Sequence, residues 1–177
     1  MRVLRRILTS LIVVIVLLVA VAYVLPRDIS VARSITIDAA PEDIFPHLNS
    51  TQKMADWSPW LERDPDVKLD YSGPEMGEGN TLTWASDKRD VGSGTQEITE
   101  SIENEKVMTA LDFGDMGGGT ASLTLAVVDG GTEVTWDLNT DMGMNPIGRW
   151  MGLMMDRWVG ADYEQGLSKL KTLVEEG

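Results

Sequence analysis

The residues that could carry chemistry are few, and they form no recognisable catalytic set. The chain has 177 residues, no cysteine and a single histidine, His47. This composition excludes thiol catalysis, disulfide bonds and cysteine-based zinc sites. No Gly-x-Ser-x-Gly turn is present to expose a serine nucleophile. His47 lies beside Pro46 in a short predicted helix, where a surface or capping role is expected rather than general-base catalysis. We therefore expect no metal ion and no other cofactor.

Glu100 is the carboxylate with the most interesting position. It shares one face of a predicted strand with Ile98 and Ile102, so the alternation predicts that it points into the interior. Burial would raise the pKa of Glu100, which could then orient a ligand hydroxyl or act as a general acid or base. The alternative is a strand-edge position or a change of register that leaves Glu100 in solvent.

Tryptophan and methionine give a stronger indication of a binding function. Six tryptophans stand against two phenylalanines, and several methionines crowd the approach to the last predicted helix. Methionine adapts to varied partners, and an indole offers a large apolar surface with one donor. Together they predict an adaptable pocket for a hydrophobic ligand, although core packing explains many of these residues equally well. We expect Trp84, Glu100 and Trp136 to line the pocket and Trp57, Trp60, Trp150 and Met154 to form its mouth, with Trp158 as a further candidate.

The charges separate the N-terminal segment from the rest of the chain. Arg2, Arg5, Arg6 and Arg27 flank an apolar run, and without them 11 basic residues stand against 28 acidic ones, a net charge of −17. So acidic a surface repels phosphate backbones, and we expect no nucleic-acid binding. It also disfavours charge-driven docking on anionic lipid. We interpret the carboxylates as a solvated surface.

Residues 7–25 carry no charge and predict a membrane-spanning helix. A helix of this length rises about 28 Å, close to the roughly 30 Å of the hydrocarbon layer. The preceding arginines place the N-terminus in the cytoplasm by the positive-inside rule. We expect a single-pass cytoplasmic (inner) membrane protein with an anchor at residues 1–27 and residues 28–177 on the extracytoplasmic side. The alternative is a cleaved signal peptide, because Ala20-Val21-Ala22 resembles a cleavage site; it would export the same residues.

The 150 residues that follow the anchor predict one domain. Apolar alternation and turn residues divide them into a first strand, a short helix beginning near Pro41, six further strands and a long C-terminal helix. The connections between the strands are mostly of hairpin length, so the sheet is expected to be antiparallel. The strands are expected at residues 29–37, 67–71, 81–85, 94–102, 106–113, 121–127 and 134–138.

The last predicted helix, residues 147–176, has an apolar stripe that changes face. The first stripe consists of Ile147, Met151, Met154, Trp158 and Ala161, and a second, nearly opposite one consists of Tyr163, Leu167, Leu170 and Val174. A straight helix cannot bury both stripes against one sheet. Either the helix bends near Gly160, or something other than the sheet covers its first half.

This order of elements resembles the helix-grip fold, and short stretches of sequence extend the resemblance. These are residues 34–42 (SITIDAAPE), 57–60 (WSPW), 131–136 (GTEVTW) and 166–171 (GLSKLK). In this order and spacing they resemble the polyketide cyclase/dehydrase-like branch of the START/Bet v 1 (SRPBCC) superfamily. The resemblance covers about residues 29–175.

The resemblance implies an α+β helix-grip fold, in which a curved seven-stranded antiparallel sheet grips the C-terminal helix. It also implies an apolar cavity between sheet and helix that receives lipids, sterols, polyketides or other hydrophobic molecules. It brings no catalytic motif, so no catalytic residue is assigned.

Three functions are compatible with the sequence. The first, which we favour, is a non-catalytic binding domain for a hydrophobic small molecule or lipid. The second is an enzyme of the cyclase/dehydrase-like type that uses Glu100 on an apolar substrate. The third is an envelope protein-interaction module that docks through residues 147–158. The sequence does not reveal the ligand or the oligomeric state.

Overall fold

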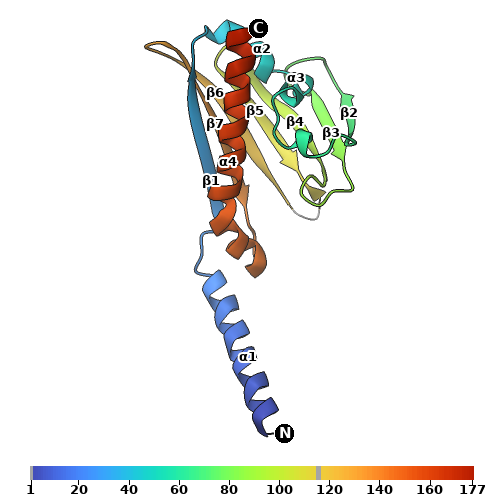
Figure 1. Cartoon of the computed structure of the whole chain (residues 1–177), viewed down its shortest axis with the longest axis vertical. Helices are drawn as coiled ribbons and strands as arrows, with labels where there is room; N and C mark the ends of the chain where they lie inside the picture. Colours follow the sequence, from blue (N-terminus) through green and yellow to red (C-terminus); the bar gives the residue numbers. More distant parts are fainter. Residues whose placement is uncertain (1, 115–116) are drawn as a thin grey trace.

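The computed structural model of the protein, which describes residues 2–114 and 117–177, confirms the predicted helix-grip fold (Figure 1). An apolar helix projects from one end of a curved sheet, and a long C-terminal helix lies across the sheet. The elements are α1 (Arg2–Ala22), β1 (Asp28–Ile37), α2 (Pro41–Leu48), α3 (Thr51–Ala55), η1 (Leu61–Arg63), β2 (Lys68–Ser72), β3 (Thr81–Ala85), β4 (Ser93–Ile102), β5 (Lys106–Asp112), β6 (Gly118–Val128), β7 (Gly131–Asp141) and α4 (Pro146–Glu176).

The sheet has the order β1-β7-β6-β5-β4-β3-β2, and every neighbouring pair is antiparallel. All seven predicted strands are present. Each consecutive pair from β2 to β7 is joined as a hairpin, and β1 closes the order by pairing with β7 from Asp28↔Asp141 to Ile37↔Thr132. This pairing places the start of β1 and the end of β7 together, at the end of the sheet nearest α1.

The concave face of the sheet is covered by α2, α3 and α4, and the core lies between these layers (Figure 1). Alternate residues of the strands supply one side of the core, for example Ile37, Ile98 and Val134, all fully buried. Helix α4 begins with Pro146 in its first turn, and the Asn145 side chain accepts a hydrogen bond from the Ile147 amide at 2.9 Å. An asparagine cap followed by proline is a typical helix start.

Helix α4 is continuous past Gly160, and it presents the same side to the sheet along its length, since the buried Gly152 and Leu170 are 18 residues, or five whole turns, apart. In the second half Tyr163, Leu167 and Leu170 are buried. In the first half the residues that face β1 are small: an added Cβ on Gly152 would lie 3.1 Å from Ile29. The first apolar stripe therefore points away from the sheet, and Ile147, Met151 and Trp158 are 68, 51 and 50% exposed.

Helix α1 is exposed along almost its whole length, and Ala22 is its buried residue. Its 21 residues are long and apolar enough to cross a membrane. A signal sequence near the N-terminus has the same properties, so this observation fits both alternatives drawn from the sequence.

Candidate functional site

Four aromatic rings fill the centre of the helix grip. The rings of Trp136 and Tyr163 stack face to face, with centroids 3.8 Å apart and planes 5° from parallel. Trp57 meets Trp136 edge-on at 5.0 Å, and Trp60 meets Trp136 at 5.6 Å and Tyr163 at 5.8 Å, also edge-on. The edge-to-face contacts of Trp57 and Trp60 have the geometry that aromatic rings prefer. We call these four residues the aromatic cluster.

The four rings of the aromatic cluster come from three parts of the fold. Trp136 lies in the middle of β7, and Tyr163 lies on α4 opposite it. Trp57 follows α3, and its indole nitrogen donates a hydrogen bond to the carbonyl of His47 at 3.2 Å. Trp60 precedes η1. Sheet, long helix and the α3–η1 connection thus meet at this cluster.

Gly166 permits the close approach of α4 to the aromatic cluster. A Cβ at this position would lie 2.8 Å from the Trp136 ring and 3.3 Å from Pro59. A contact under 3 Å to a buried ring requires the ring or the helix to move. The glycine is therefore needed by the rings that pack on it, although its backbone is ordinary helix.

Burial sets the chemistry of the aromatic cluster. Trp57 and Tyr163 are almost completely buried, Trp136 is buried, and Trp60 is half-buried. Burial, helped by the negative charge of Asp137, raises the pKa of the Tyr163 phenol far above its usual range. Tyr163 therefore remains a neutral phenol, suited to packing rather than to proton transfer.

Trp84 belongs to a second aromatic group, on β3 towards the edge of the sheet opposite β1. Its ring meets Phe113 edge-on at 5.9 Å, and its indole donates to the carbonyl of Val91 at 3.2 Å. The ring lies over Gly94, where an added Cβ would come within 2.7 Å of it. Trp84 is half-buried on β3, apart from the contacts of the aromatic cluster.

The prediction that Glu100 points into the interior is wrong. A β-bulge between Ile98 and Glu100 adds a residue to β4 and reverses the alternation beyond it. Ser101 then pairs with buried Val107, and Glu100 pairs with Met108 on the outer face. The carboxylate forms an ion pair with Lys106 at 2.7 Å, and its side chain is 42% exposed. This is the solvent-facing alternative, caused by a register shift.

Trp150, Met154 and Trp158 lie on the stripe of α4 that turns away from the sheet. The Trp150 indole donates to the carbonyl of Leu18 in α1 at 3.2 Å. The predicted mouth therefore divides: Trp57 and Trp60 join the aromatic cluster, whereas Trp150 contacts α1. Whether any of the predicted residues binds a ligand stays a prediction.

Sequence reasoning missed Tyr163 as a site residue, although the pattern contained the information. Tyr163 was placed on the helix stripe with Leu167 and Leu170, and that stripe is the one that faces the sheet. Met155 and Val159, half-buried against the same core, were also missed. To find these residues from the sequence, one would have had to decide which of the two apolar stripes of α4 faces the sheet.

Two clefts lie away from the aromatic cluster. The larger, of 920 Å³, lies at the C-terminal end of α4 and includes Asp38, Asp43, His47 and Glu175 in its lining. The smaller, of 310 Å³, lies between α1 and the start of α4. Among residues 2–114 and 117–177, no group of three or more histidine, cysteine or acidic side chains is arranged to hold a metal ion.

The sheet, the gripped helix and the aromatic interior define a helix-grip protein, and the sequence places it within that class. Residues 28–175 match the family described as polyketide cyclase / dehydrase and lipid transport, and the chain belongs to this family. No curated protein matches the chain significantly in sequence.

Solved structures share the fold at low sequence identity. The Aha1 dimer from Colwellia psychrerythraea is 22% identical, with a TM-score of 0.55 over 83% of this chain and 96% of that one. The di-domain ARO/CYC StfQ from the steffimycin biosynthetic pathway is 14% identical, with a TM-score of 0.62 over 84% of this chain and 51% of that one. Ara h 8.0201 is 12% identical, with a TM-score of 0.62 over 85% of this chain and 99% of that one.

Proposed function

We propose that residues 28–177 form a non-catalytic binding domain for a hydrophobic small molecule or lipid, and that residues 1–27 anchor it to the outer face of the cytoplasmic membrane. The observation that carries the proposal is the aromatic cluster at the centre of the grip, in a family whose description includes lipid transport. Apolar ligand sites are lined mainly by aromatic and aliphatic side chains. The geometry of Glu100 gives no support to a catalytic alternative.

A ligand would enter the grip by displacing Trp60. The four rings fill the centre, so an occupant must take the place of one of them. Trp60 is the half-buried ring, and it comes from the connection between α3 and η1 rather than from a strand or from α4. Met155, Val159 and Leu111 pack beside the same core while remaining half-buried. These flexible and branched side chains supply an apolar surface for the ligand.

The test is mass spectrometry of the intact protein, purified gently from membranes and measured under native and then denaturing conditions. We expect a defined hydrophobic molecule in the native spectrum that is lost on denaturation. Trp60→Ala should abolish or strongly reduce its retention, because the displaced Trp60 ring, which would then cover the bound ligand, is missing. Trp158→Ala is the matched control, an exposed tryptophan outside the aromatic cluster. Equal loss in both variants, or a native mass without ligand, would contradict the proposal.

The anchor has a separate support and a separate test. Helix α1 is apolar and exposed, and Arg2, Arg5 and Arg6 precede the uncharged run. We expect N-terminal sequencing of the mature membrane-bound protein to start at the first residues of the chain. A start at Tyr23 would identify residues 1–22 as a removed signal peptide.

A further inference from the structure

The first half of α4 exposes an apolar surface that the sheet does not use. Six large apolar residues of this half and of the loop before it are at least 37% exposed, and we call them the α4 patch: Met144, Ile147, Trp150, Met151, Leu153 and Trp158. Soluble surfaces rarely gather so many large apolar side chains in one place. Beyond Trp158 the same face of the helix carries Glu164, Gln165 and Ser168, all exposed. The patch thus ends sharply at Trp158.

The α4 patch is continuous with α1. Besides the hydrogen bond from Trp150 to Leu18, an apolar cleft of 310 Å³ lies between the helices. Its lining is Ile15, Leu18, Val19, Pro146, Ile147 and Trp150. Such a cleft suits an acyl chain, since every residue that lines it is apolar.

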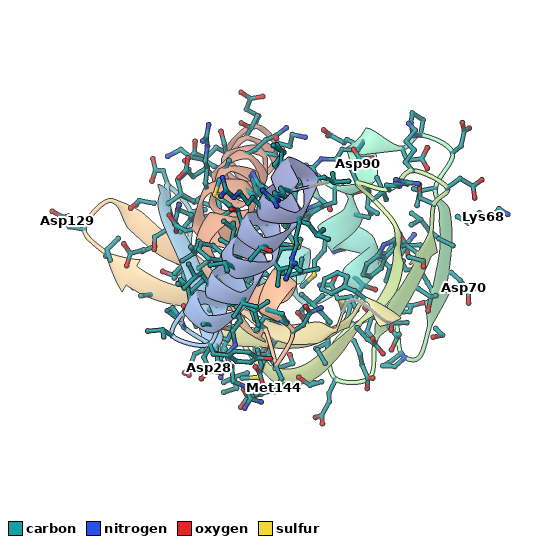
Figure 2. All side chains as sticks on the ribbon, turned by 90° about the horizontal axis from the view of Figure 1, so that it is seen from below. Asp28, Lys68, Asp70, Asp90, Asp129 and Met144 are labelled. Atoms are coloured by element: carbon teal, nitrogen blue, oxygen red, sulfur yellow. The ribbon has the colours of Figure 1, made fainter. Side chains whose placement is uncertain are left out.

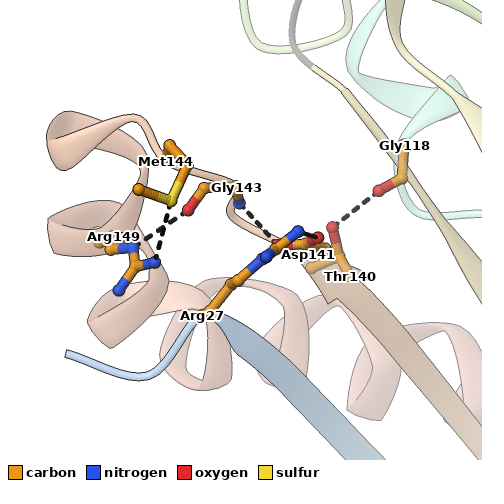
Figure 3. A network of polar contacts seen from close by, with 7 residues as sticks. All are labelled: Arg27, Gly118, Thr140, Asp141, Gly143, Met144 and Arg149. Carbon is orange, nitrogen blue, oxygen red and sulfur yellow. Dashed lines mark hydrogen bonds and ion pairs between the residues drawn. The ribbon is translucent and has the colours of Figure 1, made fainter. Parts of the chain in front are cut away.

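A polar joint connects the end of α1 to the start of α4, and Figure 3 shows two of its contacts, from Arg149 to Gly143 and from Arg27 to Asp141. The guanidinium of Arg149 donates to the carbonyls of Tyr23 at 3.4 Å, Leu25 at 3.1 Å and Gly143 at 3.0 Å, and it lies over the Tyr23 ring. Arg27 makes a two-point contact with Asp141, at 2.6 and 2.5 Å. The hydrogen bond from Arg27 lowers the pKa of Asp141 to about 2, so this pair stays ionised at neutral pH.

The length of α1 sets the depth of the α4 patch. Leu18 lies 11 residues after Ile7, which is about 17 Å along a helix, so a span that begins at Ile7 leaves Leu18 roughly 13 Å short of the far boundary of a 30 Å layer. Trp150, bonded to Leu18, is then below that boundary. Trp158 lies about 12 Å further along α4, near the level at which the apolar run of α1 ends. Tryptophan is enriched at this interface.

None of the six residues that form the α4 patch is charged. None of the 28 acidic residues lies within residues 144–155, and Arg157 is exposed beside Trp158. In the view from the side of α1, Met144 lies near the end of the molecule where α1 joins, and Asp70, Asp90 and Asp129 lie around the rim (Figure 2). Asp28 and Asp141 lie near Met144 (Figure 2), at the paired ends of β1 and β7, and Asp141 is neutralised by its ion pair with Arg27. Much of the remaining acidic surface lies away from the patch.

The geometry points to insertion of the α4 patch into the outer leaflet of the membrane, with an acyl chain in the cleft between α1 and α4. This inference rests on the anchor in the proposed function and not on the ligand. It makes the first turns of α4 a second membrane contact, which holds the grip at one orientation to the bilayer.

The absence of cysteine in the chain gives a direct test in the full-length protein. Met151→Cys, labelled with bimane, is compared with Ser168→Cys, which is exposed on α4 beyond the patch. Both are placed in phosphatidylcholine nanodiscs that contain lipid with a doxyl quencher in the acyl chain. We expect several-fold stronger quenching at position 151 than at position 168. Val21→Cys in α1 reports on the anchor.

The outcomes separate the inference from the proposed function. Strong quenching at 21 with equal, weak quenching at 151 and 168 would overturn the inserted patch and leave the anchor in place. Weak quenching at all three positions would overturn both. If the label at 151 escapes the lipid quencher and is also shielded from aqueous iodide, a protein covers the patch, and insertion into lipid is again overturned.

Discussion

The two halves of α4 show how one helix can serve two environments. The second half buries Tyr163 and Leu167 against the aromatic cluster and exposes polar residues. The first half does the opposite, because Gly152 faces β1 while Met151 and Leu153 are exposed. In a protein surrounded only by water, the arrangement in the first half would be unfavourable in free energy, because it leaves large apolar side chains in solvent. The comparison indicates that the surroundings differ along the helix.

The largest expected difference between the two halves of α4 is in the free energy of unfolding lost when a leucine in each half is replaced by alanine. Leu167→Ala should lower the free energy of unfolding by about 2–5 kcal/mol, because it opens a cavity beneath the aromatic cluster. Leu153→Ala should change it by no more than about 0.5 kcal/mol, because that side chain is half-exposed. Urea unfolding of the full chain in detergent measures both. A large cost at Leu153 would show that the first half is packed against protein.

A smaller difference in the free energy of unfolding is expected when two glycines of α4 are replaced by alanine. Gly166→Ala should destabilise by about 1–2 kcal/mol, because overpacking against the Trp136 ring outweighs the helix propensity gained. At Gly160 the added Cβ meets only the end of the Arg33 side chain, which forms surface ion pairs with Asp156 and Glu164. Gly160→Ala should therefore be close to neutral in the same unfolding measurement. Equal costs would contradict the difference in packing between the two positions.

The smallest expected effect is on the pH dependence of stability, and it comes from His47, in the cleft beside the C-terminal end of α4. Burial, followed by the charge of Lys53, lowers the pKa of His47 below its usual 6.5. The unfolded chain then binds the proton more tightly, so stability is full above pH 6.5 and falls as the pH drops through the lowered pKa. His47→Gln should reduce the loss of stability between pH 7.5 and pH 5, measured by urea unfolding at each pH. If the variant loses as much stability between pH 7.5 and pH 5 as the original chain, other titratable groups cause the loss.

The strands were predictable because their patterns depend on near neighbours. Alternation and turn residues gave all seven strands and their antiparallel order. The same reasoning failed at Glu100, where Ile98, Glu100 and Ile102 have a regular period of two. The bulge that breaks this period depends on how β4 pairs with β5, and no local pattern reveals it.

The candidate site was only partly predictable. Trp57, Trp60 and Trp136 were chosen for their residue type and proved to share one cluster, with binding still to be tested. Trp150 was chosen by the same criterion and lies against α1. Both apolar stripes of α4 can be read from the sequence, but the stripe that the sheet covers cannot. That depends on Gly152, Gly160 and Gly166, which allow the helix to approach the sheet closely.

The connection between α1 and β1 limits how far the helix-grip domain can move from α1. Only residues 23–27 separate the two elements, and five residues extend to at most about 18 Å. Tyr23, Leu25 and Arg27 are further held by the contacts of the polar joint. If α1 anchors the chain and the grip binds a ligand, as proposed, the grip cannot carry that ligand to a distant acceptor. Any molecule it collects must be released at the same leaflet or taken over by a diffusible carrier that comes to it.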